Sequence, residues 1–329
     1  MKKRTTKIVS AVLAVVMLLA MTACGSAGGG SAAPSADAGS APTVDKVVMT
    51  YVSSPLNVPS VIEKEQGQFA AAFEELGLGF EYSDLTSGSD QTTALASGDI
   101  QILNAVGGSS VLLAAANGAD ITILSMYSRA PEAFCMFSND ENINSPEALK
   151  GLTIAGPKGT NLHELLVAYL ATADMTIDDV NYVSMDIPSA VAALDSGSVD
   201  IALAGGPAAY NCEKSGKHLV TTGKDLIAAT ICTATSREFA DANPAIIEKF
   251  LETQQAIVDY MNAETEEALG ITATALDLTP EAVADMFALY NFDTAISDTD
   301  LEQLQATEEF LFNSGMIENH VDVKTLVYK

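Results

Sequence analysis

The stretch Ala94-Leu95-Ala96-Ser97-Gly98 returns 99 residues later as Ala193-Leu194-Asp195-Ser196-Gly197. In both copies the pentapeptide ends a short helical pattern and precedes an apolar strand pattern, which two glycines then close, Gly107-Gly108 and Gly205-Gly206. Chance could repeat five residues, but the same order of elements surrounds both copies. The repeat therefore predicts two structurally similar halves.

Strand and helix patterns alternate through both halves of the chain. The first half has strand patterns at 46–51, 79–82 and 100–105 and helical patterns at 60–76 and 91–96. The second half has strand patterns at 152–155, 180–185 and 199–204 and helical patterns at 161–171 and 189–194. Strands that alternate with helices form mostly parallel sheets. We therefore predict an α/β fold of two doubly wound lobes joined by two crossings, with ligands at the carboxyl ends of the strands.

Two apolar segments, Ile121–Ser125 and Ala228–Thr233, bracket the second half and are predicted to lie near the two crossings between the lobes. A long helical pattern follows Asn243-Pro244, with the proline at a first-turn position. We expect this last part of the chain to return and cover the first lobe. The predicted domains are lobe 1 at residues 44–128 and 232–329 and lobe 2 at residues 129–231.

The N-terminus has the pattern of an export signal. Four basic residues within the first seven precede the uncharged apolar run Ile8–Ala20, which is too short to span a membrane. Met21-Thr22-Ala23-Cys24-Gly25 then resembles the lipobox of bacterial lipoproteins, although Met21 stands where leucine is usual. We predict a signal peptide at residues 1–23 and lipid attachment at Cys24. The alternative is an ordinary signal peptide with an incidental cysteine.

Residues 24–43 are predicted to form the lipid anchor and a flexible linker. They are nearly all Gly, Ser, Ala and Pro, a composition that cannot bury enough apolar surface to fold. A lipid on Cys24 followed by such a linker would hold a globular body close to the bilayer. The predicted location is the outer face of the cell membrane, with the lipid anchor as the only contact with the membrane.

The charge and the residue types of the chain exclude several classes of function. Asp and Glu outnumber Lys and Arg by 43 to 16, which gives a net charge of -27, so nucleic acid is a poor partner. No nucleophile elbow, phosphate-binding loop or HExxH zinc motif occurs. The histidines, His163, His218 and His320, lie at no metal-ligand spacing. We predict a protein that is not an enzyme and that holds no metal and no cofactor.

Cys135, Cys212 and Cys232 are the cysteines beyond Cys24, an odd number without CxxC spacing. This count does not indicate a disulfide framework, and we expect buried free thiols. A bridge between Cys135 and Cys232 stays open at this point, because it requires that their strands be neighbours.

Several stretches of the chain, taken in their order, resemble one known family. They are Ser87–Gln91, Ala94–Ile100, Lys158–Leu166, Ala193–Asp200, Ser236–Phe239 with Asn243-Pro244, and the tail around Phe310-Leu311 and Gly315–Ile317. The set resembles the substrate-binding lipoproteins of ABC importers, in the sulfonate, nitrate, taurine and thiamine-pyrimidine group, over nearly the whole mature body. The resemblance implies a type II periplasmic binding protein fold, a monomer that closes on its ligand and docks on permease and ATPase subunits.

The sequence departs from that family after the last strand of the second lobe. Many relatives carry Trp-Asp-Pro-Tyr or a similar motif there, whereas this chain has Gly205-Gly206-Pro207-Ala208-Ala209-Tyr210. The missing bulk implies a cleft that is wider or less aromatic than is usual in the family.

The candidate ligand residues lie where strands end and helices begin. Gly159-Thr160-Asn161 and Ser87-Gly88-Ser89 open helices, so their backbone N–H groups and the helix dipoles suit a negative oxygen. Plain helix capping is the alternative for any one of them. Further candidates are the loop tips Gly107, Gly108, Ser109, Gly206 and Pro207, for which a simple turn is the alternative. The last candidates follow the first strand and the first crossing, and packing is the alternative for them: Tyr51, Ser53, Ser54 and Tyr127.

These patterns together favour an extracytoplasmic solute-binding lipoprotein of an ABC importer. It is expected to capture a small organic or inorganic anion, such as a sulfonate or nitrate, in a cleft between the lobes. The alternatives are a neutral heterocycle of the thiamine-pyrimidine type as the ligand, or a sensor module that keeps the fold without transport. An enzyme on the same fold would require a cofactor lysine or a reactive cysteine with a histidine, and neither is apparent.

Overall fold

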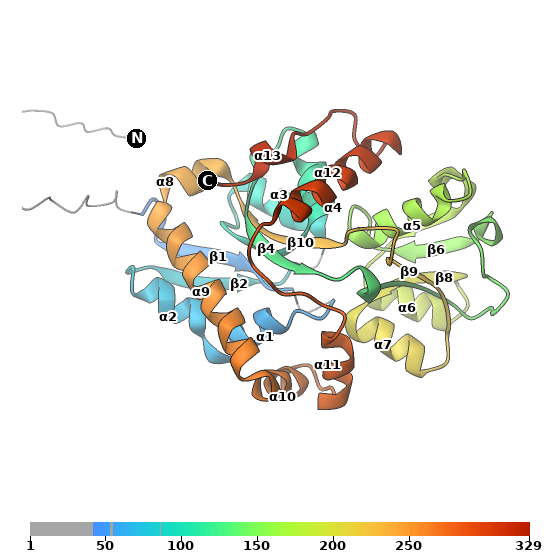
Figure 1. The fold of residues 1–329 in the computed structure, drawn as a ribbon, viewed down its shortest axis with the longest axis horizontal. Helices are drawn as coiled ribbons and strands as arrows, with labels where there is room; N and C mark the ends of the chain where they lie inside the picture. Colours follow the sequence, from blue (N-terminus) through green and yellow to red (C-terminus); the bar gives the residue numbers. More distant parts are fainter. Residues whose placement is uncertain (1–41, 53–54, 86) are drawn as a thin grey trace, which may run out of the picture. The chain divides into compact units, whose positions relative to one another are not determined.

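Strands and helices alternate along the part of the chain that the computed structural model describes, residues 42–52, 55–85 and 87–329 (Figure 1). Among these residues no helix combines the length and the apolar character that crossing a membrane requires. The predicted signal peptide, Cys24 and most of the predicted linker lie outside the described residues, as do Ser53 and Ser54.

The first sheet is built from β1 (Lys46–Thr50), β2 (Gly79–Ser83), β3 (Leu103–Gly107), β4 (Thr122–Arg129) and β10 (Thr230–Thr235). β1 and β2 pair in parallel, and a parallel bridge between Met49 and Ile102 joins β1 to the residue before β3. β10 lies antiparallel between β3 and β4. The strand order is therefore β2-β1-β3-β10-β4.

The second sheet is built from β5 (Phe134–Ser138), β6 (Thr153–Gly156), β7 (Asn181–Ser184), β8 (Ile201–Gly205) and β9 (His218–Thr222). β6 pairs in parallel with β7 and β8, and β5 lies antiparallel between β8 and β9. The strand order β7-β6-β8-β5-β9 matches that of the first sheet position by position. The predicted similarity of the two halves is confirmed at the level of topology.

Both sheets are less parallel than the sequence pattern predicts. In each sheet the fourth strand, β10 or β5, runs against both of its neighbours. Each of these two strands is the first one after the chain has passed from one sheet to the other, so it enters its sheet from the opposite end. Alternation of strands and helices reports local order and cannot show this reversal.

Helices connect the strands and extend the chain beyond them. They are α1 (Val58–Gln66), α2 (Gln68–Glu74), α3 (Gly88–Ser97), α4 (Gly108–Ala116), α5 (Asn161–Ala171), α6 (Ile187–Asp195), α7 (Gly206–Lys214), α8 (Arg237–Ala242), α9 (Pro244–Ala263), α10 (Thr265–Ala275), α11 (Pro280–Phe287), α12 (Asp298–Asn313) and α13 (Val323–Leu326), with 3-10 helices at Pro131–Ala133, Pro146–Leu149 and Ile177–Asp179. The helix predicted at 60–76 is two helices, α1 and α2. Gly67, with a φ of 65°, ends α1 in the left-handed region that glycine adopts without strain.

The repeated pentapeptide forms the same helix-ending turn in α3 and in α6. Leu95 and Leu194 are buried, at 5% and 0% exposure, and their carbonyl oxygens accept hydrogen bonds from Gly98 (3.0 Å) and Gly197 (3.1 Å). Both glycines have a positive φ, 80° and 73°. The repeat thus places one leucine in each core and stops each helix one turn later.

The long helix α9 returns to the first half, as predicted. Phe250 of α9 stacks on Phe69 of α2 with ring centroids 5.3 Å apart, and Lys249 pairs with Glu75 at 3.0 Å. α9 therefore covers α1 and α2 on the side of the first sheet (Figure 1).

The chain passes between the two sheets twice, from β4 to β5 and from β9 to β10. Arg129, at the end of β4, donates two hydrogen bonds to Asp300 of α12, at 2.7 and 2.6 Å. Burial alone would raise the pKa of Asp300, but hydrogen bonds from Arg129 and Ser297 lower it to about 2. This ion pair anchors the first crossing to α12.

Candidate ligand cavity

A cavity of about 70 Å³ lies between the loops of the two sheets, and we call it the cleft cavity. Its lining residues are Val52, Pro55, Asn57, Gly88, Gln91, Ala105, Gly107 and Ser110 from the first half, Phe134, Pro157, Thr160, Asn161, Leu162 and Ile187 from the second, and Ile231 from β10. Four of the residues singled out from the sequence, Gly88, Gly107, Thr160 and Asn161, are therefore brought together here.

The N-termini of α1, α3, α4 and α5 all meet at the cleft cavity. The N-cap residues Asn57, Ser87, Gly107 and Thr160 make no side-chain capping hydrogen bond to these helices. Ser87 Oγ instead shares a hydrogen bond with Ser89 Oγ (2.8 Å), and Thr160 Oγ1 donates to the carbonyl of Pro157 (2.9 Å). The alternative that Ser87 and Thr160 serve as ordinary helix caps is therefore disfavoured.

Hydrogen bonds between the halves hold the N-termini of α4 and α5 together. Ser109 Oγ donates to Asn161 Oδ1 (2.7 Å), and Ser110 Oγ donates to the carbonyl of Gly159 (2.6 Å). Asn161 Nδ2 in turn donates to the carbonyl of Thr230 (3.2 Å). Three of the predicted residues, Ser109, Gly159 and Asn161, therefore serve first as contacts between the halves.

Two glycines are required by the close packing of neighbouring elements beside the cleft cavity. A Cβ on Gly88 would lie 2.0 Å from Ser110 Oγ, and one on Gly108 would lie 2.5 Å from Thr230 Oγ1. Each of these hydroxyl groups belongs to a neighbouring element, so an added methyl group would push that element away. Glycine therefore keeps the helix N-termini within reach of the cavity.

Two residues that line the cleft cavity have a buried amide oxygen without a hydrogen-bond partner among the described residues, Asn57 Oδ1 and Gln91 Oε1. Asn57 is 1% exposed and Gln91 is 2% exposed. Neither residue is among the ligand candidates predicted from the sequence. Gln91 follows Gly88 by three residues on α3 and so shares its face, which is the signal that could have identified it.

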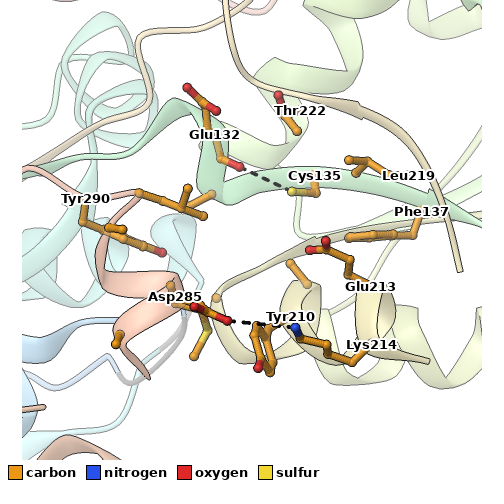
Figure 2. A pocket seen from close by; sticks show the side chains of 17 residues that line it. Glu132, Cys135, Phe137, Tyr210, Glu213, Lys214, Leu219, Thr222, Asp285 and Tyr290 are labelled. Carbon is orange, nitrogen blue, oxygen red and sulfur yellow. Dashed lines mark hydrogen bonds and ion pairs between the residues drawn. The ribbon is translucent and has the colours of Figure 1, made fainter. Parts of the chain in front are cut away.

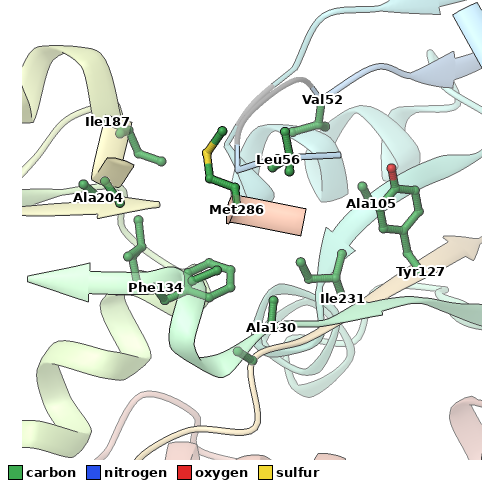
Figure 3. Packing of buried hydrophobic residues seen from close by; sticks show 14 of the residues in the cluster. Val52, Leu56, Ala105, Tyr127, Ala130, Phe134, Ile187, Ala204, Ile231 and Met286 are labelled. Atoms are coloured by element: carbon green, nitrogen blue, oxygen red, sulfur yellow. The ribbon is translucent and has the colours of Figure 1, made fainter. Parts of the chain in front are cut away.

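The walls of the cleft cavity are apolar. Figure 3 shows Phe134 and Ile187 from the second half, with Val52, Ala105 and Ile231 across from them. Among the described residues that line the cavity none is charged. The site can therefore hold an oxyanion only through N–H and amide groups, with an apolar part of the ligand against the walls.

A buried carboxyl lies behind this lining. Glu164 of α5 is 3% exposed and accepts a hydrogen bond from Ser109. Burial raises its pKa to about 7, and hydrogen bonds from Ser109 and Thr307 offset part of the shift. His163 beside it has its pKa lowered to about 4, by burial and then by Lys158, and stacks on Tyr182 at 4.8 Å. His163 is thus a neutral packing residue.

The remaining predicted residues lie away from the cleft cavity. Tyr51 packs edge-on against Tyr82 (5.6 Å) beneath Lys64 Nζ (3.7 Å), and the Tyr127 hydroxyl is bonded to Ser60 inside the first half. Gly206, with a φ of 55°, packs so closely on the Pro55–Leu56 backbone that a Cβ would lie 2.5 Å from Leu56 N. The described cavity lining also omits Gly108, Ser87, Ser89 and Pro207.

A larger hollow of about 530 Å³ lies beside the cleft, between β5, β9, α7 and α11 (Figure 2). Gly206 and Ala209 line it, so the bulk missing from this segment opens the hollow rather than the cleft cavity itself. Lys214 and Asp285 face each other across it at 3.9 Å. None of the helix N-termini described above reaches this hollow, and we do not assign the oxyanion site to it.

The three cysteines that the structure describes are buried thiols. Cys135, Cys212 and Cys232 are free and buried, as expected, and Cys135 and Cys232 stand in different sheets. Burial raises the pKa of the Cys135 and Cys232 thiols to about 12. No group of three or more His, Cys, Asp or Glu side chains that could hold a metal ion occurs among the described residues.

Relatives by sequence are named as binding proteins. A family model described as NMT1/THI5 like matches residues 58–268. A protein of Bacillus subtilis (strain 168) named for binding aliphatic sulfonates is 26% identical over 274 residues, 82% of each chain. The taurine-binding periplasmic protein of Escherichia coli (strain K12) is 28% identical over 200 residues, 59% of this chain and 60% of that protein.

Solved structures with the same fold include both a binding protein and an enzyme. The alkanesulfonate-binding protein of Xanthomonas axonopodis pv. citri, bound to MOPS, has a TM-score of 0.78 at 20% identity, over 87% of this chain and 98% of that one. The desulfurization enzyme DSZB has a TM-score of 0.61 at 15% identity, over 86% and 96%. The predicted periplasmic binding protein fold is confirmed, and this fold alone does not exclude catalysis.

Proposed function

The chain belongs to the NMT1/THI5-like family, and from that premise we propose that it captures a small sulfonate for an ABC importer. The observation that carries the proposal is the meeting of the N-termini of α3, α4 and α5, which have no side-chain caps, at a cavity with apolar walls. Helix N-termini carry partial positive charge and free N–H groups, which together bind the oxygens of an anion. A sulfonate offers three such oxygens on a short apolar stem. The names of the two sequence relatives support the same ligand class.

The strong negative charge of the whole chain does not prevent anion binding in the cleft cavity. The net charge is -27, but salt screens that field beyond about 8 Å at physiological ionic strength. Within the cavity the nearest groups are helix N-termini, amides and apolar side chains, with no carboxylate in the described lining. Local dipoles therefore decide the binding, and the global charge mainly slows the approach of the anion.

In this proposal the two halves act as lobes that close over the ligand. Lobe 1 comprises residues 44–128 and 232–329, and lobe 2 comprises residues 129–231. The two passages of the chain between the sheets can serve as hinges, and the hydrogen bonds of Ser109 and Ser110 to α5 and its preceding loop would form on closing. Closure excludes water, which strengthens every hydrogen bond to the bound oxyanion. The predicted ligand contacts at Gly88, Gly107, Thr160 and Asn161 are kept as part of the proposal.

The proposed setting is the outside of the cell membrane, with Cys24 as the site of lipid attachment. The N-terminal sequence pattern and the periplasmic relative support this location. The partners would be the permease and ATPase subunits of the importer, each contacted by a monomer of this protein. A sensor without transport would use the same cleft, so the presence of importer subunits is what separates the two roles.

A neutral heterocycle is the second candidate ligand. The observation that favours it is the lack of any charged side chain in the described lining, together with the Phe134 ring, which can stack on a planar molecule. Such a ligand would use the amides of Asn57 and Gln91 and leave the helix N-termini to water.

Calorimetric titration tests the sulfonate proposal. The mature protein, purified without sulfonate buffers, is titrated with ethanesulfonate, nitrate and an aminopyrimidine. We expect binding of ethanesulfonate and a loss of at least tenfold in Gly88→Ala, because the added methyl group displaces the Ser110 hydroxyl, which donates to the carbonyl of Gly159 in the second half. Gly270→Ala is the matched control, since a Cβ there meets nothing within 4 Å.

Each outcome of that titration decides between the candidates. Binding of the aminopyrimidine alone would replace the sulfonate by the heterocycle. Binding of nitrate with no sulfonate would leave an inorganic anion carrier. Failure of short and longer sulfonates to bind folded protein would overturn the proposal.

A further inference from the structure

We infer that Asn57 makes the cleft cavity select ligands that carry a hydrogen-bond donor close to the oxyanion. The inference rests on the proposed function and names the subclass of sulfonate: a short chain with an ammonium, amide or hydroxyl group one or two carbons from the sulfur. Nitrate and simple alkanesulfonates present only acceptors.

The orientation of the Asn57 amide is fixed by its surroundings. Asn57 Nδ2 donates to the carbonyl of Val52 at 2.6 Å. A reversed amide would place Oδ1 against that carbonyl, with two acceptors facing each other. Asn57 Oδ1 is therefore an acceptor, and it has no partner among the described residues.

Asn57 Oδ1 cannot be satisfied by its own helix. An N-cap oxygen normally accepts from the N–H of the second or third helical residue. In α1 the second residue is Pro59, which has no N–H, and the N–H of the third residue, Ser60, donates to the Tyr127 hydroxyl at 3.1 Å. Both usual donors are therefore removed, and the oxygen stays unpaired in a residue that lines the cleft cavity.

A second amide lies in the same lining. Gln91 is 2% exposed, and its Oε1 has no partner among the described residues. No hydrogen bond to the residues that the structure describes fixes the orientation of this amide, so Gln91 can turn either its oxygen or its NH₂ toward a ligand. The Asn57 side chain therefore always presents a hydrogen-bond acceptor, whereas the Gln91 side chain can present either an acceptor or a donor to the ligand.

The small size of the cavity and its apolar walls make this demand selective. At about 70 Å³ the cavity leaves little room for waters beside a bound sulfonate. A ligand that has no donor would leave Asn57 Oδ1 buried and unpaired, which lowers affinity. The walls around it, Val52, Phe134 and Ile231 among them, offer no alternative donor.

The test compares ligands that differ by one group. Ethanesulfonate, 2-hydroxyethanesulfonate and 2-aminoethanesulfonate are titrated calorimetrically into the mature wild-type protein. We expect the two donor-bearing sulfonates to bind at least tenfold more tightly than ethanesulfonate, a difference of about 1.4 kcal/mol. Equal affinities would overturn the inference while leaving the sulfonate proposal intact. Binding of none of the three would overturn both.

A variant then assigns the preference to Asn57. In Asn57→Leu the affinity ratio of 2-hydroxyethanesulfonate to ethanesulfonate should fall to about one; the ratio is read on the same variant, so a general loss of affinity cancels. Asn144→Leu, an exposed asparagine in the loop after β5, is the matched control and should keep the wild-type ratio. A ratio in Asn57→Leu that stays at the wild-type value would overturn the assignment. If Asn57→Leu does not fold, Asn57→Ser also removes the amide oxygen and disturbs the surrounding packing less.

Discussion

Replacing Glu164 with glutamine is expected to remove a pH dependence from ligand binding. Glu164 of α5 is 3% exposed and takes hydrogen bonds from Ser109 of α4 and Thr307 of α12, both in the first half. Burial raises its pKa to about 7 from an ordinary value of 4.5, against the opposing effect of these hydrogen bonds. Closing the proposed lobes therefore favours the protonated carboxyl.

The magnitude follows from these two pKa values. When the lobes open, water returns the pKa of Glu164 to about 4.5, and the gap up to about 7 corresponds to about 3 kcal/mol. Because the closed form holds the proton more tightly, acid favours closure, and this advantage is lost progressively as the pH rises from 4.5 through 7. Between pH 6 and pH 8 the closed form, and with it the affinity for a sulfonate, should fall about tenfold.

Calorimetry with ethanesulfonate at pH 6, 7 and 8 measures this effect, since the charge of that ligand does not change in the range. The neighbouring charges do not produce it: Arg129 and Asp300 are paired with each other, and the pKa of His163 lies at about 4. Asp225, which lies with Glu164 in the lining of one surface hollow, is unchanged between wild type and variant. In Glu164→Gln, which keeps the contact to Ser109, we expect a flat profile. A flat profile in the wild type, or an unchanged slope in the variant, would refute the reasoning.

Two further predictions concern stability, measured by urea unfolding. Gly98→Ala and Gly197→Ala should each lower the free energy of unfolding by about 1–2 kcal/mol, because both positions require a positive φ. A lower free energy of unfolding in only one of the two variants would contradict the equivalence of the repeats. Arg129→Leu should lower the free energy of unfolding by about 3–5 kcal/mol, because it leaves the Asp300 carboxylate buried without its cationic partner. The Asp300 side chain is 4% exposed. Arg129→Leu/Asp300→Leu should recover most of that loss, and a double variant no more stable than the single one would count against the pairing.

Much of the fold could be predicted because its signals are local. The pentapeptide copies carry the leucine and glycine that end α3 and α6, and the pattern at 161–171 coincides with α5. The antiparallel placement of β5 and β10 was missed, since it depends on where the chain stands after each crossing. The break at Gly67 was missed because the apolar pattern continues on both sides of it.

The candidate site was predicted in part. The sequence marks helix starts, and four of the residues chosen on that ground, Gly88, Gly107, Thr160 and Asn161, line the cleft cavity. Tyr51 and Tyr127 follow strands equally well in sequence, but their rings pack within the first half. Asn57 carries no sequence signal of its own, and the only signal for Gln91 is its three-residue spacing from Gly88 on α3.

The sequence by itself determined the class of fold, its repeat, and the N–H groups that open each helix, because these follow from contacts between residues close in the chain. Only the tertiary structure decided which helix starts face one another and which buried amides are left unpaired. A free acceptor such as Asn57 Oδ1 exists only because Pro59 lacks an N–H and Tyr127, distant in sequence, takes the next one. Whether a buried polar group finds a hydrogen-bond partner depends on all the residues around it, and these residues come together only in the folded chain.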